Sequence, residues 1–387
     1  METYIQRQVE SEVIRLASKF PAIGIVGPRQ IGKTTLAKHV SSQLTKNSSY
    51  FDLEYPEDWA ALQEPVRLLE RMQDEVVIID EVQRLPTLFP VLRALIDRHR
   101  VPGRFILLGS ASPELIRQSS ESLAGRIVYL ELTPFALSEL PNGIDWEMHW
   151  LRGGFPESLL ASDDQSSSEW RISFIRSYLE RDLQLLGLNA DPVLLRRLWT
   201  MLAHLNGQLL NKQTLSGSLG ISTSIVGRYI DFFESAFLIT RLQPFVPNLG
   251  KRLVKSPKVY IKDTGILHQL LNIQSFQGLL SHPGLGASWE SYVLHQILAH
   301  LPFGYEMYFY RTHEGAEADM VITNGGVPQM LVEVKFSTTP QVSKGFFNVQ
   351  ADLGTKSHYL IAPVTRSFPG KNGIEVLGVQ DIPNMFK

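Results

Sequence analysis

Short apolar runs alternate with amphipathic stretches along the first third of the chain. Ile23–Val26, Val76–Ile79 and Phe105–Leu108 are runs of β-forming residues with the length of buried strands. Residues 1–20 and the stretch that opens at Lys33 place their apolar side chains at helical spacing. Buried strands that alternate with helices are typical of a parallel sheet, so we expect an α/β fold here.

The middle of the chain has a different pattern. Residues 134–190 are mostly helical in pattern and are expected to form a lid, with the Ser/Asp-rich stretch Ala161–Ser168 as a surface loop. Over residues 191–260, three helices with a tight glycine turn before the third, and a strand from Ala236 onward, indicate a winged helix-turn-helix. The three helices are expected at Leu194–Leu205, Lys212–Leu219 and Thr223–Phe233.

The last part of the chain, residues 261–387, combines one long helix with several strands. The helix is expected at Gly286–His300, and the strands at Tyr305–Arg311, Ala318–Thr323 and Met330–Phe336. Together with a core over residues 1–133, this pattern predicts four parts, bounded at 1–133, 134–190, 191–260 and 261–387.

Composition and charge narrow the classes of function. The chain has 387 residues and no cysteine, which excludes disulfides and thiolate metal sites. A net charge of −2 means that any nucleic-acid site must be local. No apolar run approaches the length of a membrane span, and the first ten residues are too charged for a signal peptide. We therefore expect no membrane partner and a cytoplasmic location.

The residues between the first strand and the next helix carry the clearest chemistry. Gly27, Gly32, Lys33 and Thr34 follow the G-x-x-x-x-G-K-[ST] spacing of a phosphate-binding loop. Lys33 is expected to reach the β- and γ-phosphates of ATP, and the Thr34 hydroxyl to ligate Mg²⁺. The predicted nucleotide contacts are Gly27, Pro28, Arg29, Gln30, Ile31, Gly32, Lys33, Thr34 and Thr35.

Two further strands end in polar residues at the edge where open α/β sheets bind nucleotides. Asp80 is expected on the Mg²⁺ side, and Glu81 is placed to polarise the attacking water. Ser110 follows the Phe105 strand and is expected either to contact the γ-phosphate or to cap the helix expected around residues 113–120.

Four stretches of the chain resemble the prokaryotic AAA-type ATPases that carry a C-terminal domain of unknown function. They are Gly-Pro-Arg-Gln-Ile-Gly-Lys-Thr-Thr-Leu, Ile-Ile-Asp-Glu-Val-Gln-Arg, Leu-Ala-Gly-Arg and Gly-Gly-Phe-Pro-Glu. The resemblance implies an AAA+-like core in which Asp80 and Glu81 are the Walker B pair and Ser110 is the sensor. It also implies that Arg126 is an arginine finger acting on a neighbouring subunit, and hence a homo-oligomer. The alternative for Arg126 is a structural ion pair within its own subunit.

Basic residues gather after the third helix of the expected winged helix. No acid interrupts the chain between Arg241 and Lys262, which is the local patterning that phosphate contacts need. The predicted DNA contacts are Arg228, Lys251, Arg252 and Lys255. The alternative is that this region packs as a mechanical lever and contacts no DNA.

The C-terminal part contains acids at the spacing of a metal site. Glu333 and Lys335 share one face of an expected strand, and Asp319 joins them if its strand is a hairpin partner. With Glu290 on the preceding helix, this pattern resembles the PD-(D/E)xK nuclease fold, in which Glu290, Asp319 and Glu333 would hold Mg²⁺ and Lys335 would activate a water. The alternative is the ordinary alternation of charges on a solvated strand.

These features predict an ATP-hydrolysing, DNA-binding protein that remodels or processes DNA, with metal-dependent cutting as one of its activities. Two alternatives stay open. The first is an ATP-gated DNA-binding switch whose nuclease-like domain is inactive and serves for docking. The second is a signalling ATPase whose winged helix and C-terminal domain bind protein.

Overall fold

We describe the fold from a computed structural model, in which residues 4–111, 123–141, 143–247 and 252–387 are described. The chain forms two compact units. Unit 1 comprises residues 1–135, 185–187 and 235–237, and unit 2 comprises the rest. The expected helix around residues 113–120 and the predicted DNA contact Lys251 lie outside the described residues. No helix in the described ranges combines the length and apolarity that a bilayer span requires.

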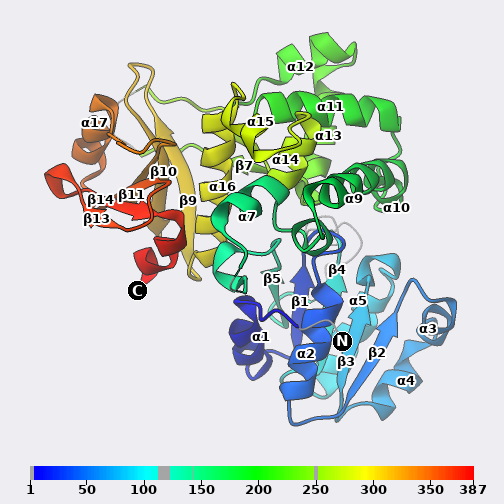
Figure 1. Ribbon diagram of the computed structural model, residues 1–387. Helices are drawn as coiled ribbons and strands as arrows, with labels where there is room; N and C mark the ends of the chain where they lie inside the picture. Colours follow the sequence, from blue (N-terminus) through cyan, green and yellow to red (C-terminus); the bar gives the residue numbers. More distant parts are fainter. Residues whose placement is uncertain (1–3, 112–122, 142, 248–251) are drawn as a thin grey trace. The chain divides into compact units, whose positions relative to one another are not determined.

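Unit 1 is built on a five-stranded parallel sheet with the order β2-β3-β4-β1-β5 (Figure 1). The strands are β1 (Ala22–Val26), β2 (Ser48–Asp52), β3 (Val76–Asp80), β4 (Phe105–Gly109) and β5 (Ile127–Glu131). The helices are α1 (Val9–Ala17), α2 (Lys33–Gln43), α3 (Pro56–Ala61), α4 (Pro65–Arg71) and α5 (Leu88–Arg98). All five residues of β1, β3 and β4 are buried, as their apolar runs predict. The carboxyl ends of these parallel strands meet at one edge of the sheet, where the predicted nucleotide residues follow them.

Unit 2 begins with helices and a small antiparallel sheet. Its helices before the C-terminal sheet are α7 (Trp146–Arg152), α8 (Pro156–Leu159), α9 (Asp164–Ser177), α11 (Pro192–His204), α12 (Lys212–Leu219) and α13 (Thr223–Ser235). The sheet has the order β6-β8-β7, from β6 (Gln208–Leu209), β8 (Lys258–Ile261) and β7 (Ile239–Leu242). The three helices lie where the sequence predicts them, and β7 lies within the strand expected from Ala236 onward. The short strand β6, between α11 and α12, was not predicted.

One expectation for this region is wrong. The Ser/Asp-rich stretch Ala161–Ser168 is not a loop throughout, because α9 begins inside it at Asp164. The Asp163 side chain accepts a hydrogen bond from the Ser166 backbone N–H at 2.7 Å and caps the helix. Ser and Asp favour helix N-caps as strongly as turns, so composition alone did not separate the two.

The C-terminal sheet of unit 2 has six strands in the order β13-β14-β12-β11-β10-β9. They are β9 (Tyr305–Arg311), β10 (Glu317–Asn324), β11 (Val327–Val334), β12 (Ser357–Ala362), β13 (Phe368–Pro369) and β14 (Glu375–Gly378). The helices here are α14 (Thr264–Leu270), α15 (Phe276–Leu280), α16 (Leu285–His300) and α17 (Lys344–Leu353), with a 3₁₀ segment at Val379–Phe386. Because β10 pairs with β11 in an antiparallel hairpin, the predicted partnership of the two strands is confirmed.

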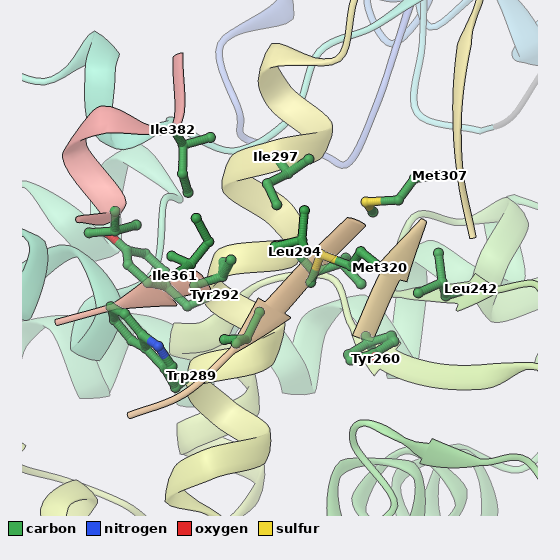
Figure 2. Packing of buried hydrophobic residues seen from close by; sticks show 14 of the residues in the cluster. Leu242, Tyr260, Trp289, Tyr292, Leu294, Ile297, Met307, Met320, Ile361 and Ile382 are labelled. Atoms are coloured by element: carbon green, nitrogen blue, oxygen red, sulfur yellow. The ribbon is translucent and has the colours of Figure 1, made fainter. Parts of the chain in front are cut away.

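A single apolar core joins the small sheet to the C-terminal sheet. Leu242 of β7 and Tyr260 of β8 belong to the same buried cluster as Trp289 of α16, Met320 of β10 and Ile361 of β12 (Figure 2). Residues from both of the parts predicted at 191–260 and 261–387 therefore form one hydrophobic interior. The boundary predicted at residue 133 lies within two residues of the end of the first segment of unit 1, and the finer division stays a prediction.

Candidate nucleotide site and charged cluster

The phosphate loop runs from the end of β1 to the start of α2. Gly27 has φ 153°, and a Cβ at this position would lie 2.3 Å from the carbonyl oxygen of Leu132. Gly32, with φ 89°, is the N-cap of α2. Glycine tolerates both requirements, the positive φ and the close backbone approach. The resulting turn leaves unpaired backbone N–H groups at the start of a helix, which is where a phosphate binds.

Lys33 is buried and points back along the loop that precedes it. Its ammonium donates to the carbonyl oxygens of Gly27 at 3.0 Å and Pro28 at 2.7 Å, and to Ser110 Oγ at 3.1 Å. Burial lowers the pKa of Lys33 to about 8, against the opposing charges of Glu81 and Asp80. Within the described residues its hydrogen bonds go to neutral oxygens only, so its charge is available for a phosphate.

The Mg²⁺ residues predicted from the sequence lie in contact. Thr34 Oγ1 donates to Asp80 Oδ2 at 2.5 Å, although the two residues are 46 positions apart. Tyr50 of β2, which the sequence analysis missed, donates its hydroxyl to the same oxygen at 3.0 Å. In ATP sites Mg²⁺ is held by few protein oxygens and completes its shell with phosphates and water. The Thr34–Asp80 pair fits that requirement.

Glu81 and Ser110 form the other half of the site. Ser110 is fully buried, and its hydroxyl donates to Glu81 Oε1 at 2.8 Å while it accepts from Lys33. Gln83 also donates to Glu81. Glu81 has φ 52°, in the left-handed region that costs energy for a residue with a Cβ, and such residues cluster at active sites. The Glu81 carboxylate is thus held by two donors.

The remaining loop residues make contacts inside unit 1. Arg29 pairs with Glu54, which also accepts from Arg84 at 3.1 Å. Arg7, missed by the sequence analysis because it is far from the motif, donates to the carbonyl oxygen of Ile31 at 3.0 Å and supports the loop. The roles of Pro28, Arg29, Gln30, Ile31 and Thr35 as nucleotide contacts stay predictions.

Arg126 makes an ion pair within its own chain. Its Nε and one terminal nitrogen donate to the two carboxylate oxygens of Asp97 at 2.6 Å and 2.9 Å. Hydrogen bonds from Arg126 lower the pKa of Asp97. This is the arrangement that the structural alternative predicted, and the role of Arg126 as a finger in trans stays a prediction.

In unit 2 the three predicted metal ligands do come together. Asp319 accepts a hydrogen bond from the Val334 backbone at 2.8 Å, and Glu333 pairs with Lys335 at 2.8 Å. Glu290 and Glu333 lie with Asp319 in the lining of one cavity of about 680 Å³. Burial, with the Asp319 charge, raises the pKa of Glu333 to about 7, against the opposing charge of Lys335.

A lysine that the sequence analysis assigned to the basic run also lies in this cluster. Lys258 of β8 is 4% exposed, and its ammonium is 3.1 Å from Glu290 and 3.1 Å from Glu317, a further acid of β10. Across the described ranges, no three acidic or histidine side chains are arranged to hold a metal ion. The role of Glu290, Asp319 and Glu333 as Mg²⁺ ligands stays a prediction.

The basic run divides into paired and unpaired residues. Arg241 is paired with Asp231 at 2.7 Å and with Glu234, so it is not free for phosphate, and Lys258 is buried. Arg252 and Lys255 are exposed, and no carboxylate of the described residues pairs with them. They line a cavity of about 770 Å³ together with Arg311 and His313 and without any acid.

Backbone pairing produces this basic pocket. The Val254 N–H donates to the Arg311 carbonyl at 3.1 Å, and the His313 N–H donates to the Arg252 carbonyl at 3.0 Å. The segment after residue 251 thus lies along the end of β9. Arg228, the other described DNA prediction, is exposed on α13 with its guanidinium 5.6 Å from the Tyr229 ring centre, and it is not among the residues that line the pocket.

Comparisons with known proteins match three stretches of this chain. Residues 19–141 match a family model described as an AAA domain. Residues 143–277 and 285–382 match two models described as domains of unknown function, DUF8612 and DUF4143. A solved structure, the Walker-type ATPase PABY2304 of Pyrococcus abyssi, is 15% identical and aligns with 69% of this chain and 96% of that chain at a TM-score of 0.49.

Two curated relatives match almost the whole chain. They are the uncharacterized proteins Mb2031c of Mycobacterium bovis and Rv2008c of Mycobacterium tuberculosis. Each is 39% identical over 364 residues, which cover 94% of this chain and 81% of the relative. The chain therefore belongs to the family of these two mycobacterial proteins, and its AAA domain makes it a P-loop ATPase.

Proposed function

We propose that this ATPase hydrolyses Mg-ATP in unit 1 and binds DNA through the basic pocket of unit 2. The observation that carries the DNA part is the pocket lined by Arg252, Lys255, Arg311 and His313, with no acid among its described lining residues, on a chain of net charge −2. Arg311 also lies 3.6 Å from Glu317, so Arg252 and Lys255 are the cations on which the proposal rests. A cationic concavity on a protein of negative net charge is the local feature that phosphate binding needs. The three helices and small sheet before it support the winged helix-turn-helix interpretation.

For hydrolysis, each side chain has a role that its contacts support. Lys33 would bind the β- and γ-phosphates, and Thr34 with Asp80 would hold Mg²⁺, which neutralises charge on the phosphates. Glu81 would take a proton from the attacking water. Ser110 touches both Lys33 and Glu81, so it is positioned to report the state of the γ-phosphate to the base.

Among the functions that the sequence left open, ATP-gated DNA binding without cutting has more support than a metal-dependent nuclease. The nuclease-like cluster contains two lysines among its acids, and these lysines pair with Glu290 and Glu333, two of the three acids predicted to bind Mg²⁺. The cavity that contains this cluster shares Leu209, Arg311 and Gly315 with the basic pocket, so a polyanion in the pocket would lie beside it. The C-terminal sheet would then serve for docking.

Fluorescence anisotropy tests the DNA part of this proposal. The wild-type protein is titrated with duplex, single-stranded and forked DNA, with and without ATP, at several salt concentrations. For the double variant Arg252→Ala, Lys255→Ala we expect weaker binding to all sequences. The slope of log affinity against log salt should also be smaller by roughly two, about one unit for each lost phosphate contact.

A matched control removes the same charge elsewhere on unit 2. Lys356 and Lys371 are exposed and lie outside both cavities, so the variant Lys356→Ala, Lys371→Ala should keep the wild-type affinity and slope. If the pocket variant binds like wild type, the basic pocket has no DNA role and the lever interpretation replaces it. ATP turnover that DNA stimulates would distinguish a DNA-binding ATPase, with or without cutting, from a signalling ATPase that binds protein.

A further inference from the structure

Lys258 occupies the centre of the acidic cluster in unit 2. Its ammonium lies 3.1 Å from Glu290 Oε1, 3.1 Å from Glu317 Oε1 and 3.8 Å from Asp319 Oδ1. The three carboxylates come from α16 and β10, so one ammonium group joins two elements. The Tyr260 hydroxyl completes the environment by donating to the same oxygen of Glu290.

The position of this lysine is set by its strand. Lys258 lies on β8, the central strand of the three-stranded sheet, where its backbone pairs with Leu209 of β6 and with Leu242 of β7. A residue held from both sides cannot withdraw its backbone without breaking the sheet. The side chain is 4% exposed, and its ammonium also lies 5.6 Å from the centre of the Phe309 ring. The ammonium is therefore fixed in the cluster by the fold.

The charges of the cluster are already close to balance. Four acids line the cavity, namely Glu290, Glu317, Asp319 and Glu333. Lys258 and Lys335 lie against them, and Arg311 is 3.6 Å from Glu317. Mutual repulsion among the acids is the usual reason that such a site needs a divalent ion. Here the cations of the chain remove most of that need, and a divalent ion would be repelled by Lys258.

We propose that the Lys258 ammonium is the resident cation of this cluster, occupying the position that a divalent metal would take in a nuclease. The cavity is then a metal-free acid–lysine site. It does not bind Mg²⁺ or Mn²⁺ and does not cut DNA, although three of its four acids are those predicted for metal binding. Removing the ammonium should turn it into a metal site, because Glu290, Glu317 and Asp319 would lose the one cation that contacts all three of them.

Mn²⁺ binding measured by calorimetry tests this directly. All proteins carry Asp80→Asn and are studied without nucleotide, so that the ATP site does not contribute. We expect no Mn²⁺ binding by this parent into the millimolar range. Adding Lys258→Met should create one site per chain, with affinity about tenfold or more above the parent. Adding Glu290→Gln as well should remove that site.

Two control variants separate charge from packing. Lys258→Arg keeps the positive charge and should show no Mn²⁺ site. Lys335→Met removes the other lysine of the cavity, which is 41% exposed and bonds Glu333 only, and should leave Mn²⁺ binding at the parent level. If the Lys258→Met protein folds and gains no Mn²⁺ affinity, the proposal is wrong.

The parent protein provides a test that does not depend on the folding of any lysine variant. If it binds Mn²⁺ at a site that Asp319→Asn removes, or if the wild type cuts branched or single-stranded DNA with Mg²⁺ or Mn²⁺, the resident-cation proposal fails. DNA binding by the basic pocket depends on Arg252 and Lys255 and is measured separately, so it can hold even if the resident-cation proposal fails.

Discussion

A histidine in α16 predicts an acid sensitivity of unit 2. His295 is partly exposed as a residue, but both of its ring nitrogens are shielded from solvent. Burial, helped by the charge of Lys262, lowers its pKa from 6.5 to about 3. Because the unfolded chain takes up this proton near pH 6.5 and the folded chain does not, the contribution to stability is complete above pH 6.5 and is lost as the pH falls.

The size of this effect follows from the pKa difference. At about pH 5, roughly 1.5 pH units below the pKa of His295 in the unfolded chain, protonation of the unfolded state lowers the free energy of unfolding by about 2 kcal/mol. The variant His295→Leu cannot take up this proton. We therefore expect wild type to lose about 2 kcal/mol more than His295→Leu between about pH 7.5 and pH 5. At the higher pH the imidazole is neutral in the folded and the unfolded state, so this proton contributes nothing to the difference in stability between wild type and the variant.

Urea unfolding at the two pH values measures this difference. Tryptophan fluorescence is a suitable signal, since Trp150 and Trp289 are buried in the core that α16 helps to form. The control is His313→Leu, which replaces an exposed histidine and should follow wild type at both pH values. An equal loss of stability in wild type and His295→Leu would show that His295 is protonated in the fold and that the reasoning from burial is wrong.

Two further predictions concern the ATP site. Glu81→Gln should still bind ATP in a nucleotide-binding assay, while steady-state hydrolysis falls by roughly 10²–10⁴ because the attacking water loses its base; normal turnover would mean that Glu81 is not that base. Arg126→Ala should lower turnover by about 10³–10⁵ if the residue acts as a finger, and mixing it with Lys33→Ala should restore part of the activity. If Asp97→Ala, which breaks the same ion pair, lowers turnover equally and mixing gives no rescue, Arg126 is structural.

The site residues that could be predicted from the sequence either lie in one continuous stretch of the chain or follow from the positions of buried strands. The phosphate loop is a contiguous run in which Gly27 and Gly32 serve positions that other residues fit poorly. Asp80 follows four apolar residues, and parallel strands place their carboxyl ends together, so its meeting with Thr34 was predictable. Asp319 and Glu333 likewise follow from the pairing of two neighbouring strands.

The partners of the charged side chains could not be predicted from the sequence. In the sequence, Arg241 and Lys258 belong to one basic run. In the folded chain, a long flexible side chain forms an ion pair with whichever carboxylate lies within its reach. Arg241 meets Glu234 of α13, while Lys258 on a central strand is directed into the acids of α16 and β10. The phosphate loop and the strand ends were predictable from the sequence, because the backbone conformation there is set by residues that are neighbours in the chain. Packing between distant elements decided which cations remain free for a phosphate and which one lies among the acids.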